Sequence, residues 1–471
     1  MCFSGLPGRR NQVDQFRRLP HGFGADEVVY VSLLAFGAVL WASSSQPLSI
    51  ALLAGGALVS IWSPVGAFWA CCAAIPFVYH PIDIGSVSVT LLELGLMAAI
   101  GGIGGRIVIE RTRFSYNAWI DPGTIRWVWL GAFGLLVAGA LAIAFQPGDG
   151  HVRESIRTYR WVIVEGIAAF AAARYALAKR GGERIVVALA IPAFGVSLWA
   201  IAELLLRRSG FEADGVVRAT GSYMHPNNLA LYLLRVVVLL GGAAALARPE
   251  RIPRHWIAGT ALTGLALAAA LSRGALIGAI AGMLVIGWYA RRRSVVLAAA
   301  GAVIVLPAAF LLFAEQRFLG GETSGIGGTR LKIWNSAIEM IRDYPISGIG
   351  LDQFLYQHNP RYIEPSAWSE RYISHPHNLI LDSWLSLGLP GLLLLAGAII
   401  ALARQMIGIS RDWPLVQWWP AAAAASLTAG LMHALVDNGY FLPDLAVMTW
   451  ILIALTLGPV CSSRPDYPGL R

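Results

Sequence analysis

Long apolar runs recur along the chain and alternate with short polar segments. A helix needs about 20 apolar residues to cross roughly 30 Å of hydrocarbon, and most of the runs approach this length. Transmembrane β-strands would instead alternate in polarity over stretches of about 10 residues, and the sequence shows no such alternation. The pattern predicts an all-α polytopic membrane protein with about 12–14 transmembrane helices. The predicted spans are 27–44, 47–62, 65–79, 88–105, 126–145, 159–178, 185–206, 227–247, 255–271, 274–290, 294–314, 377–403, 415–435 and 441–460.

The polar segments divide the chain into five parts. We expect a cytoplasmic tail at 1–26, transmembrane helices at 27–314, one long external loop at 315–376, further transmembrane helices at 377–460 and a cytoplasmic tail at 461–471. The first part carries arginines but no adjacent cleavage signature, so we interpret it as a retained tail. Most of the 36 basic residues then fall on the cytoplasmic side, as the positive-inside rule requires.

Composition and charge exclude several classes of protein. Of the 471 residues, 56% are hydrophobic and 13% are charged, against about 25% charged in soluble domains, so a soluble fold is excluded. The 4 cysteines stand at Cys2, Cys71, Cys72 and Cys461 and form no disulfide or zinc motif, so we expect no metal site. The net charge of +9 follows largely from topology and does not indicate a nucleic acid partner.

Basic residues also gather on the predicted external side, in larger number than orientation alone favours. We infer an external anionic ligand, because guanidinium groups bind phosphate oxygens in a bidentate manner. Arginines that reach lipid headgroups or pack at helix ends are the alternative explanation. The external clusters are Arg153, Arg157 and Arg160; Arg207, Arg208 and Arg218; Arg273; and Arg317, Arg330, Lys332, Arg342, Arg361 and Arg371.

The long loop is the only extensive polar segment, and loops of this length are usually functional. Apolar residues at helical spacing predict an amphipathic helix over Arg330–Arg342, capped by Thr329 and lying along the bilayer surface. The run Ser347–Gly350 then predicts a flexible turn. A covering lid without ligand contact is the alternative role for the loop.

The loop ends in Ser374-His375-Pro376-His377-Asn378, directly before an apolar run. We expect His377 at a helix N-terminus, where the helix dipole disfavours the imidazolium form and favours the neutral form that a general base needs. A simple cap or interfacial anchor is the alternative role.

A second motif, Arg218 to Asn228, also lies immediately before a span. Gly221 and Pro226 predict a turn, and Asn227 or Asn228 can cap the following helix.

Charged residues inside membrane spans are costly and indicate pairing or function. They are Glu93, Glu165, Arg235 and Asp437. An ion pair between Glu165 and Arg235 is possible. Asp437, with His433 one turn earlier, either orients His377 or serves packing alone.

Four blocks of residues resemble the signature of the bacterial O-antigen ligase and polysaccharide polymerase superfamily. Together they cover roughly residues 215–395, and the first two hundred residues match only in hydropathy. The blocks are His377-Asn378 with Gly388 and Gly391; Arg218-x-x-Gly221 with Pro226-Asn227; Ser272-Arg273-Gly274; and Arg330-x-x-x-Trp334 with Pro345-x-x-Gly348-x-Gly350.

The resemblance implies a GT-C-like fold and a metal-independent, inverting glycosyltransferase without a cofactor. Its donor would be an undecaprenyl-diphosphate-linked glycan, and its acceptor a hydroxyl of a lipid core or another glycan, at the external face of the bacterial inner membrane. By the same resemblance, Arg218 and Arg330 hold the diphosphate and His377 activates the acceptor. The further residues expected to bind substrate are Arg153, Arg157, Asn227, Arg273, Asn378 and Asp437.

Two alternatives stay open at this point. A repeat-unit polymerase of the same superfamily would carry the same motifs. A transporter of lipid-linked sugars or anions would differ in class, since transporters commonly show internal repeats and paired broken helices. Neither feature is visible in the sequence, and the polar motifs gather at one predicted membrane face.

Overall fold

The computed structural model describes residues 24–42, 46–84, 87–109, 124–148, 150–208, 211–213, 216–247, 254–291, 329–411 and 417–458. Helices dominate these residues, and the strands among them form two short antiparallel hairpins. The longer helices are α2 (Ala25–Ala42), α3 (Gln46–Trp62), α4 (Pro64–Ala74), α5 (Leu91–Ile109), α7 (Thr124–Ala144), α9 (Glu165–Arg180), α10 (Gly182–Leu205), α11 (Pro226–Leu246), α12 (Arg254–Ala269), α13 (Arg273–Ala290), α16 (Thr329–Asp343), α18 (Leu379–Arg411), α19 (Trp418–Ala434) and α20 (Pro443–Thr456). The shorter elements are α8 (Val152–Thr158), α17 (Phe354–Gln357), the helical turns Ile75–Phe77, Tyr159–Val164, His358–Tyr362 and Pro365–Glu370, and the hairpins β1 (Ile82–Ile84) with β2 (Val87–Val89) and β3 (Glu212–Ala213) with β4 (Val216–Val217).

The predicted class is confirmed: the protein is an all-α polytopic membrane protein. Seven helical segments among the described residues are long and apolar enough to cross a membrane, and four shorter apolar helices accompany them. Each predicted span in this part of the chain overlaps one of these helices, α2 or α19, because continuous apolar runs satisfy their backbone hydrogen bonds only as helices. The predicted span 294–314 lies outside the described residues, as do residues 1–23 of the predicted N-terminal tail and the whole predicted C-terminal tail.

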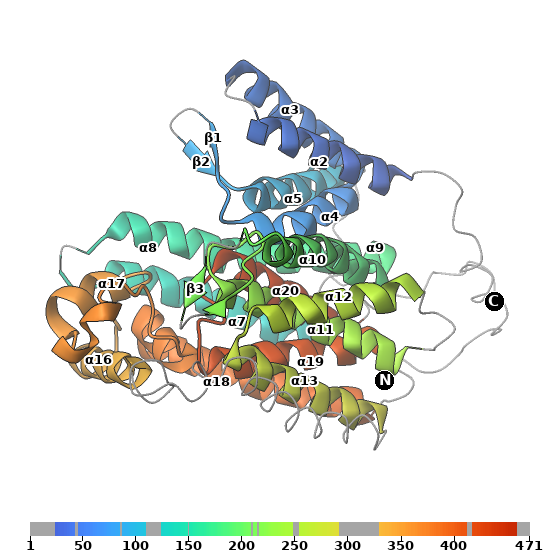
Figure 1. Ribbon diagram of the computed structural model, residues 1–471. Helices are drawn as coiled ribbons and strands as arrows, with labels where there is room; N and C mark the ends of the chain where they lie inside the picture. The colour runs from blue at the N-terminus through green and yellow to red at the C-terminus, as the bar shows by residue number, and fades with distance from the viewer. Residues whose placement is uncertain are drawn as a thin grey trace, which may run out of the picture.

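The helices lie side by side in an elongated bundle, with α2 and α3 at one edge and α13 and α18 at the other (Figure 1). At its centre, α19 packs against both α11 and α13. Small residues permit this close packing: an added Cβ at Gly242 would lie 2.5 Å from that of Ala422. The alanines at positions 421 to 425 of α19 are all fully buried.

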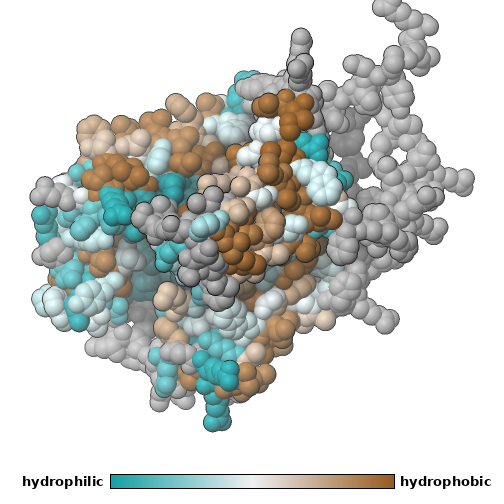
Figure 2. Space-filling model, turned by 90° about the horizontal axis from the view of Figure 1, so that it is seen from above, coloured by the Kyte–Doolittle hydropathy of each residue, from teal (hydrophilic) through white to brown (hydrophobic). Residues whose placement is uncertain are grey.

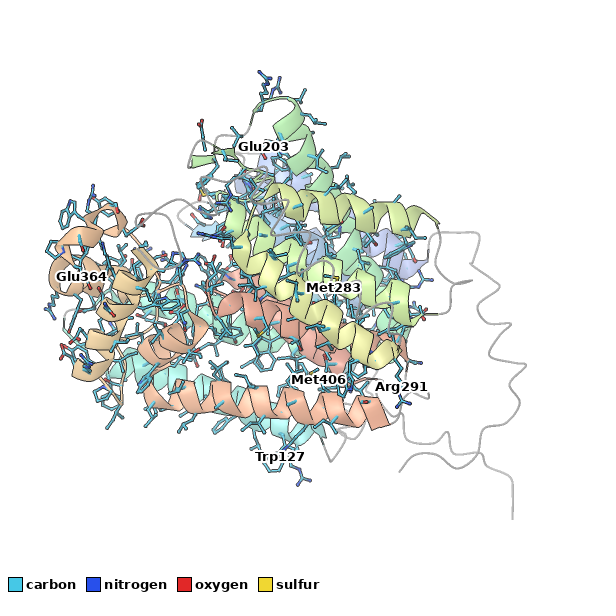
Figure 3. All side chains as sticks on the ribbon, turned by 60° about the horizontal axis from the view of Figure 1, so that its bottom comes forward. Trp127, Glu203, Met283, Arg291, Glu364 and Met406 are labelled. Atoms are coloured by element: carbon cyan, nitrogen blue, oxygen red, sulfur yellow. The ribbon has the colours of Figure 1, made fainter. Side chains whose placement is uncertain are left out.

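The two ends of the bundle differ in polarity. One end, which we call the loop end, consists of α16, α17 and the segment before α18 (Figure 1). Hydrophilic residues gather at this end, whereas hydrophobic residues cover much of the adjoining helix surface (Figure 2). Glu364 lies at the loop end and Arg291, at the end of α13, lies at the opposite end (Figure 3).

Helix α18 is broken at Gly388, although the sequence predicts one continuous span there. Gly388 has φ +67° and ψ −165°, outside helical geometry, and Pro390 follows two residues later. The break is filled by the loop backbone: Ile349 N donates to the carbonyl of Leu385 at 2.7 Å, and Leu389 N donates to the carbonyl of Ile346 at 3.0 Å.

The turn predicted at Ser347–Gly350 is present and packs against α18. Gly348 has φ +66°, and a Cβ there would lie 2.7 Å from the carbonyl oxygen of Trp384. A Cβ at Gly388 would clash with the carbonyl oxygen of Ile346. The two glycines therefore allow two backbone segments to touch, and the turn is docked on α18.

The predicted amphipathic helix is present as α16, but its apolar face is covered by protein. Ile333, Ala337 and Met340 are buried against Leu385 of α18 and residues of the loop itself. Because this face is covered, it is not available for contact with the bilayer, and the placement of α16 along the bilayer surface stays a prediction. The side chain of Thr329, the predicted cap, lies outside the description.

The possible ion pair between Glu165 and Arg235 does not form. Arg235 donates instead to the backbone carbonyls of Leu231 and Gly439, at 2.7 and 2.6 Å. Arg160 lies 2.6 Å from Glu93 and 3.8 Å from Glu165, because the wide turn at Tyr159–Val164 carries it to this position.

Candidate functional site

Asp437 is the centre of a polar cluster at the loop end of the bundle. It lies in the short connection between α19 and α20 and is 3% exposed. Its carboxylate oxygens are joined by four side chains: His377 Nδ1 at 2.9 Å, Asn227 Nδ2 at 3.0 Å, and Arg330 and His375, both at 3.8 Å. The structure thus brings together His377, Arg330, Asn227 and Asp437, four residues that the sequence proposes from widely separated segments.

His377 stands two residues before the start of α18. It adopts φ +53°, while Asn378 caps the helix by accepting hydrogen bonds from the backbone N–H groups of Ile380 and Leu381. The amide of Asn378 also donates to the carbonyl of Leu435, 3.0 Å away, and so ties α18 to the end of α19. Asn378 therefore serves as the cap, and His377 projects from just outside the helix.

The contact between His377 and Asp437 determines which ring nitrogen faces the carboxylate and which one faces away from it. Burial favours the neutral acid and so raises the pKa of Asp437, but the nearby His377 and His375 outweigh this effect, and the pKa lies well below its ordinary value. In the tautomer that donates its Nδ1–H to this carboxylate, the His377 ring keeps its Nε2 lone pair. Because the His377 side chain is 21% exposed, that nitrogen can meet a substrate.

Arg330 lies in the first turn of α16, with 21% of its side chain exposed. Trp334, one turn later, donates its indole N–H to the carbonyl of Pro376 at 2.9 Å. This bond fixes α16 to the residue before His377. The spacing Arg330-x-x-x-Trp334 therefore places a cation and its anchor on one face of a helix.

Arg218 is buried, with 1% of its surface exposed. Its Nε and one Nη donate to the carbonyl of Ala270 at 2.8 and 2.6 Å, and the same Nη donates to Asn227 Oδ1 at 2.8 Å. The Asn227 amide thus accepts from Arg218 and donates to Asp437. Arg218 reaches the cluster through Asn227, with its guanidinium already engaged by protein atoms.

The prediction that Asn227 or Asn228 caps the following helix is wrong. The cap of α11 is His225, whose Nδ1 accepts the N–H of Asn227 at 3.1 Å. The cap role is filled by a histidine, and the Asn227 side chain is available for Asp437.

The block Ser272-Arg273-Gly274 begins α13. Ser272 caps this helix, and its hydroxyl lies 3.4 Å from His433 Nε2. A Cβ at Gly274 would lie 2.7 Å from the same nitrogen, so glycine is needed for this approach. Arg273 is half-buried at the first position of the helix.

The remaining predicted arginines lie apart from Asp437. Arg153 is exposed on α8, and Arg157 pairs with Asp352 at 3.3 Å while its guanidinium lies 5.3 Å from the Trp161 ring. Burial raises the pKa of Asp352, and Arg157 opposes that effect. In the described contacts, Arg157 is engaged by the Asp352 carboxylate.

The sequence analysis missed His375 as a member of the cluster. Its Nε2 lies 3.8 Å from Asp437 Oδ1, and its ring centroid lies 4.3 Å from that of His377. The available signal was its position two residues before His377. The three residues His375, His377 and Asp437 bring potential metal-ligand atoms within 4.8 Å of one another.

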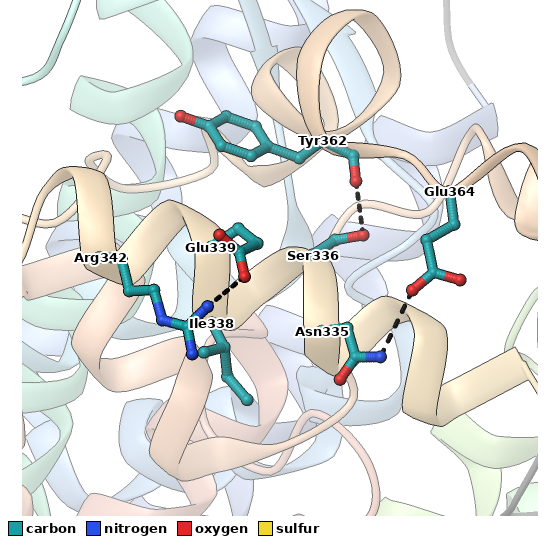
Figure 4. A pocket seen from close by; sticks show the side chains of 7 residues that line it. All are labelled: Asn335, Ser336, Ile338, Glu339, Arg342, Tyr362 and Glu364. Carbon is teal, nitrogen blue, oxygen red and sulfur yellow. Dashed lines mark hydrogen bonds and ion pairs between the residues drawn. The ribbon is translucent and has the colours of Figure 1, made fainter.

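Two cavities adjoin the loop end. One, of about 380 Å³, runs along the outer side of α16 between Asn335, Glu339, Arg342, Tyr362 and Glu364 (Figure 4). The other, of about 70 Å³, is bordered by His375 and Asn438 and lies next to the Asp437 cluster. The larger cavity presents amide, hydroxyl and carboxylate groups but does not border Asp437.

Residues 258–396 match the family model described as O-Antigen ligase. The chain carries an O-antigen ligase-like domain. The matched range of this domain includes α13, α16 and the His377 segment, whereas Arg218, Asn227 and Asp437 lie outside it. A comparison with curated proteins finds no match. The family match confirms the resemblance of the sequence and supports a ligase-like or polymerase-like glycosyltransferase function in the membrane.

Proposed function

We propose that this protein transfers a glycan from an undecaprenyl-diphosphate donor to an acceptor hydroxyl at the external face of the bacterial inner membrane. The observation that supports this proposal best is the convergence of a histidine, held by a buried carboxylate, and an arginine on Asp437. A general base and a cation for a phosphate leaving group are the two groups that such a transfer needs.

His377 acts as the general base in this proposal. Its Nε2 removes the proton of the acceptor hydroxyl while the acceptor oxygen attacks the anomeric carbon of the donor. The bond between that carbon and the diphosphate oxygen breaks, the electron pair leaves with the diphosphate, and the configuration inverts. Asp437 fixes the tautomer through Nδ1 and stabilises the imidazolium that forms, as the carboxylate does in the Ser-His-Asp arrangement.

Arg330 compensates the charge of the departing diphosphate. Its guanidinium is partly exposed and lies next to the base, so it can bind phosphate oxygens as the bond to the sugar breaks. This arrangement provides the charge compensation that a divalent cation provides in other transferases, so we propose that the reaction requires no metal.

We assign Arg218 a positioning role. The carbonyl of Ala270 and the amide of Asn227 already take up its guanidinium, so contact with the donor would cost these buried hydrogen bonds. Through Asn227, Arg218 orients Asp437. We assign Asn378 a positioning role as well, because it caps α18 and so holds the backbone next to His377.

Ligase and polymerase activities would use the same chemistry, and they differ in the acceptor. A ligase transfers a finished chain to a different molecule, whereas a polymerase transfers a chain to another lipid-linked repeat. The family match supports both activities, so the polymerase is the second candidate.

The test is replacement of His377 by alanine in the native host, with analysis of lipid-linked and surface polysaccharide by gel and mass spectrometry. We expect transfer to fall at least 100-fold, because a general base contributes about 10²–10⁴-fold. His151→Ala is the matched control, since His151 is an exposed histidine at the same end of the molecule and its ring stacks on Tyr356.

The accumulated product separates the candidates. Full-length polymer on its lipid carrier indicates a ligase, and single repeats on the carrier indicate a polymerase. Unchanged glycans with a folded His377→Ala protein would refute the catalytic role and favour a transporter.

A further inference from the structure

His375, His377 and Asp437 present three ligand atoms of the types that bind first-row transition metals. The atoms are His375 Nε2, His377 Nδ1 and a carboxylate oxygen of Asp437, all within 4.8 Å of one another. Two imidazoles and one carboxylate on one face of a site leave further coordination positions open, as in other sites with this donor set.

The distances agree with those that a metal requires. Ligand atoms about 2.0–2.1 Å from a tetrahedral zinc ion lie roughly 3.3 Å from each other. Asp437 Oδ1 lies 2.9 Å from His377 Nδ1 and 3.8 Å from His375 Nε2, so these distances bracket that value.

The surrounding hydrogen bonds suit the same role. Ser374 Oγ lies 3.0 Å from His375 Nδ1, so the hydroxyl can accept the Nδ1–H. In that tautomer Nε2 carries a lone pair that can bind a metal ion. Asp437 also accepts hydrogen bonds from Asn227 Nδ2 and from the backbone N–H of Asn438, at 3.0 and 2.9 Å. Both histidine side chains are about one-fifth exposed, which gives an ion a path to them.

Arg330 is the main opposing group, because its guanidinium lies 3.8 Å from Asp437 Oδ2. That separation is longer than a direct hydrogen bond, and the partly exposed side chain can turn away from an incoming cation. A metal ion that competes with Arg330 for the Asp437 carboxylate can therefore reach that carboxylate.

We propose that His375, His377 and Asp437 bind a divalent transition-metal ion of the zinc type, and that the bound ion inhibits glycan transfer. A metal on Nδ1 of His377 replaces the proton there, so the neutral ring must carry its proton on Nε2. The nitrogen that would take the proton of the acceptor hydroxyl then has no lone pair to offer. The inhibitory part rests on the proposed function, whereas the binding part does not.

The binding test uses the purified full-length protein in nanodiscs, stripped with EDTA and titrated with ZnCl₂ by calorimetry. We expect one site per chain, with affinity reduced at least tenfold in His375→Ala and in His377→Ala and unchanged in His151→Ala. A second substitution, His375→Gln, keeps a polar side chain in case the alanine variant unfolds. Zinc binding that is equal in all variants would overturn the proposal.

The activity test adds ZnCl₂ to membranes that carry out transfer. We expect zinc to inhibit the unaltered protein, and we expect the transfer that His375→Ala still carries out to need at least tenfold more zinc for the same fractional inhibition. Equal zinc sensitivity of the two proteins would overturn the inhibitory part, as would loss of transfer on EDTA treatment, which would show a required metal. If zinc binds as expected but no variant or parent transfers glycan, the proposed function fails and the metal site stands.

Discussion

Replacement of Asp437 by asparagine tests the centre of the site while preserving its shape. Asp437 Oδ1 accepts from His377 Nδ1 and from the backbone of Asn438, and Oδ2 accepts from Asn227 and faces Arg330. Both oxygens therefore face donors, but an asparagine has only one acceptor oxygen. Its NH₂ group must oppose either His377 or Asn227.

The magnitude follows from these contacts. A hydrogen bond to a charged group is worth about 1.5–3 kcal/mol, which corresponds to roughly 10–150-fold in rate if it is lost in the transition state. If the amide NH₂ faces His377, the ring must also present Nδ1 as acceptor and Nε2 as N–H, which removes the base entirely and costs about 10²–10⁴-fold. We therefore expect transfer by Asp437→Asn to fall at least tenfold, and by about 10²–10⁴-fold if the amide NH₂ faces His377.

The assay compares glycan transferred per folded protein in the native host, with the amount of inserted protein measured in the same membranes. Asp444→Asn is the matched control, because Asp444 is a buried carboxylate of which only Oδ2 has a partner, the hydroxyl of Tyr223 at 3.1 Å. An amide carbonyl can accept that bond, so we expect activity close to that of the unaltered protein. More than a tenth of normal transfer by a folded Asp437→Asn protein would refute the reasoning.

Two further predictions concern stability. Gly388→Ala should lower the thermal unfolding midpoint, because residue 388 has a positive φ and an added Cβ would clash with the carbonyl oxygen of Ile346. Gly397→Ala in the same helix is the control, since an added Cβ there meets open space and should leave the midpoint unchanged or raise it. Equal midpoints for the two variants would contradict this account. Burial lowers the pKa of His358, whose ring is stacked on Phe354. The stability contributed by the neutral ring is therefore present above the unfolded value of about 6.5 and is lost as pH falls below it, by up to about 1.4 kcal/mol per pH unit. Between pH 7.5 and pH 5.5, the thermal unfolding midpoint should fall further for the unaltered protein than for His358→Phe. Equal falls in the two midpoints would contradict the role of His358.

Helix positions could be predicted from the sequence because the hydrophobic runs and the helices have one physical cause. An apolar segment in a membrane can satisfy its peptide groups only within itself, so its length fixes the helix. The break in α18 has a different cause. Hydropathy is continuous across Gly388, and the break depends on a loop backbone that approaches from residues Ile346–Gly350.

The site could be predicted in its members but not in its arrangement. His377, Arg330 and Asn227 belong to recognisable blocks, yet their common partner Asp437 lies 60 residues after His377 along the chain. Local rules assigned the asparagine cap incorrectly because they consider only neighbours in sequence. Asn227 instead serves a partner 210 residues away.

The break in α18 also determines how far the site stands from the lipid. The part of α18 after Gly388 rises about 34 Å at 1.5 Å per residue, which is by itself enough to cross the hydrocarbon. The first part, from Leu379 to Leu387, is then not needed for crossing. It is a helical segment about 13 Å long that separates His377 from the membrane-crossing part. In the proposed function, a lipid-anchored donor would therefore meet the histidine above the acyl chains, at the height where its phosphates emerge into water.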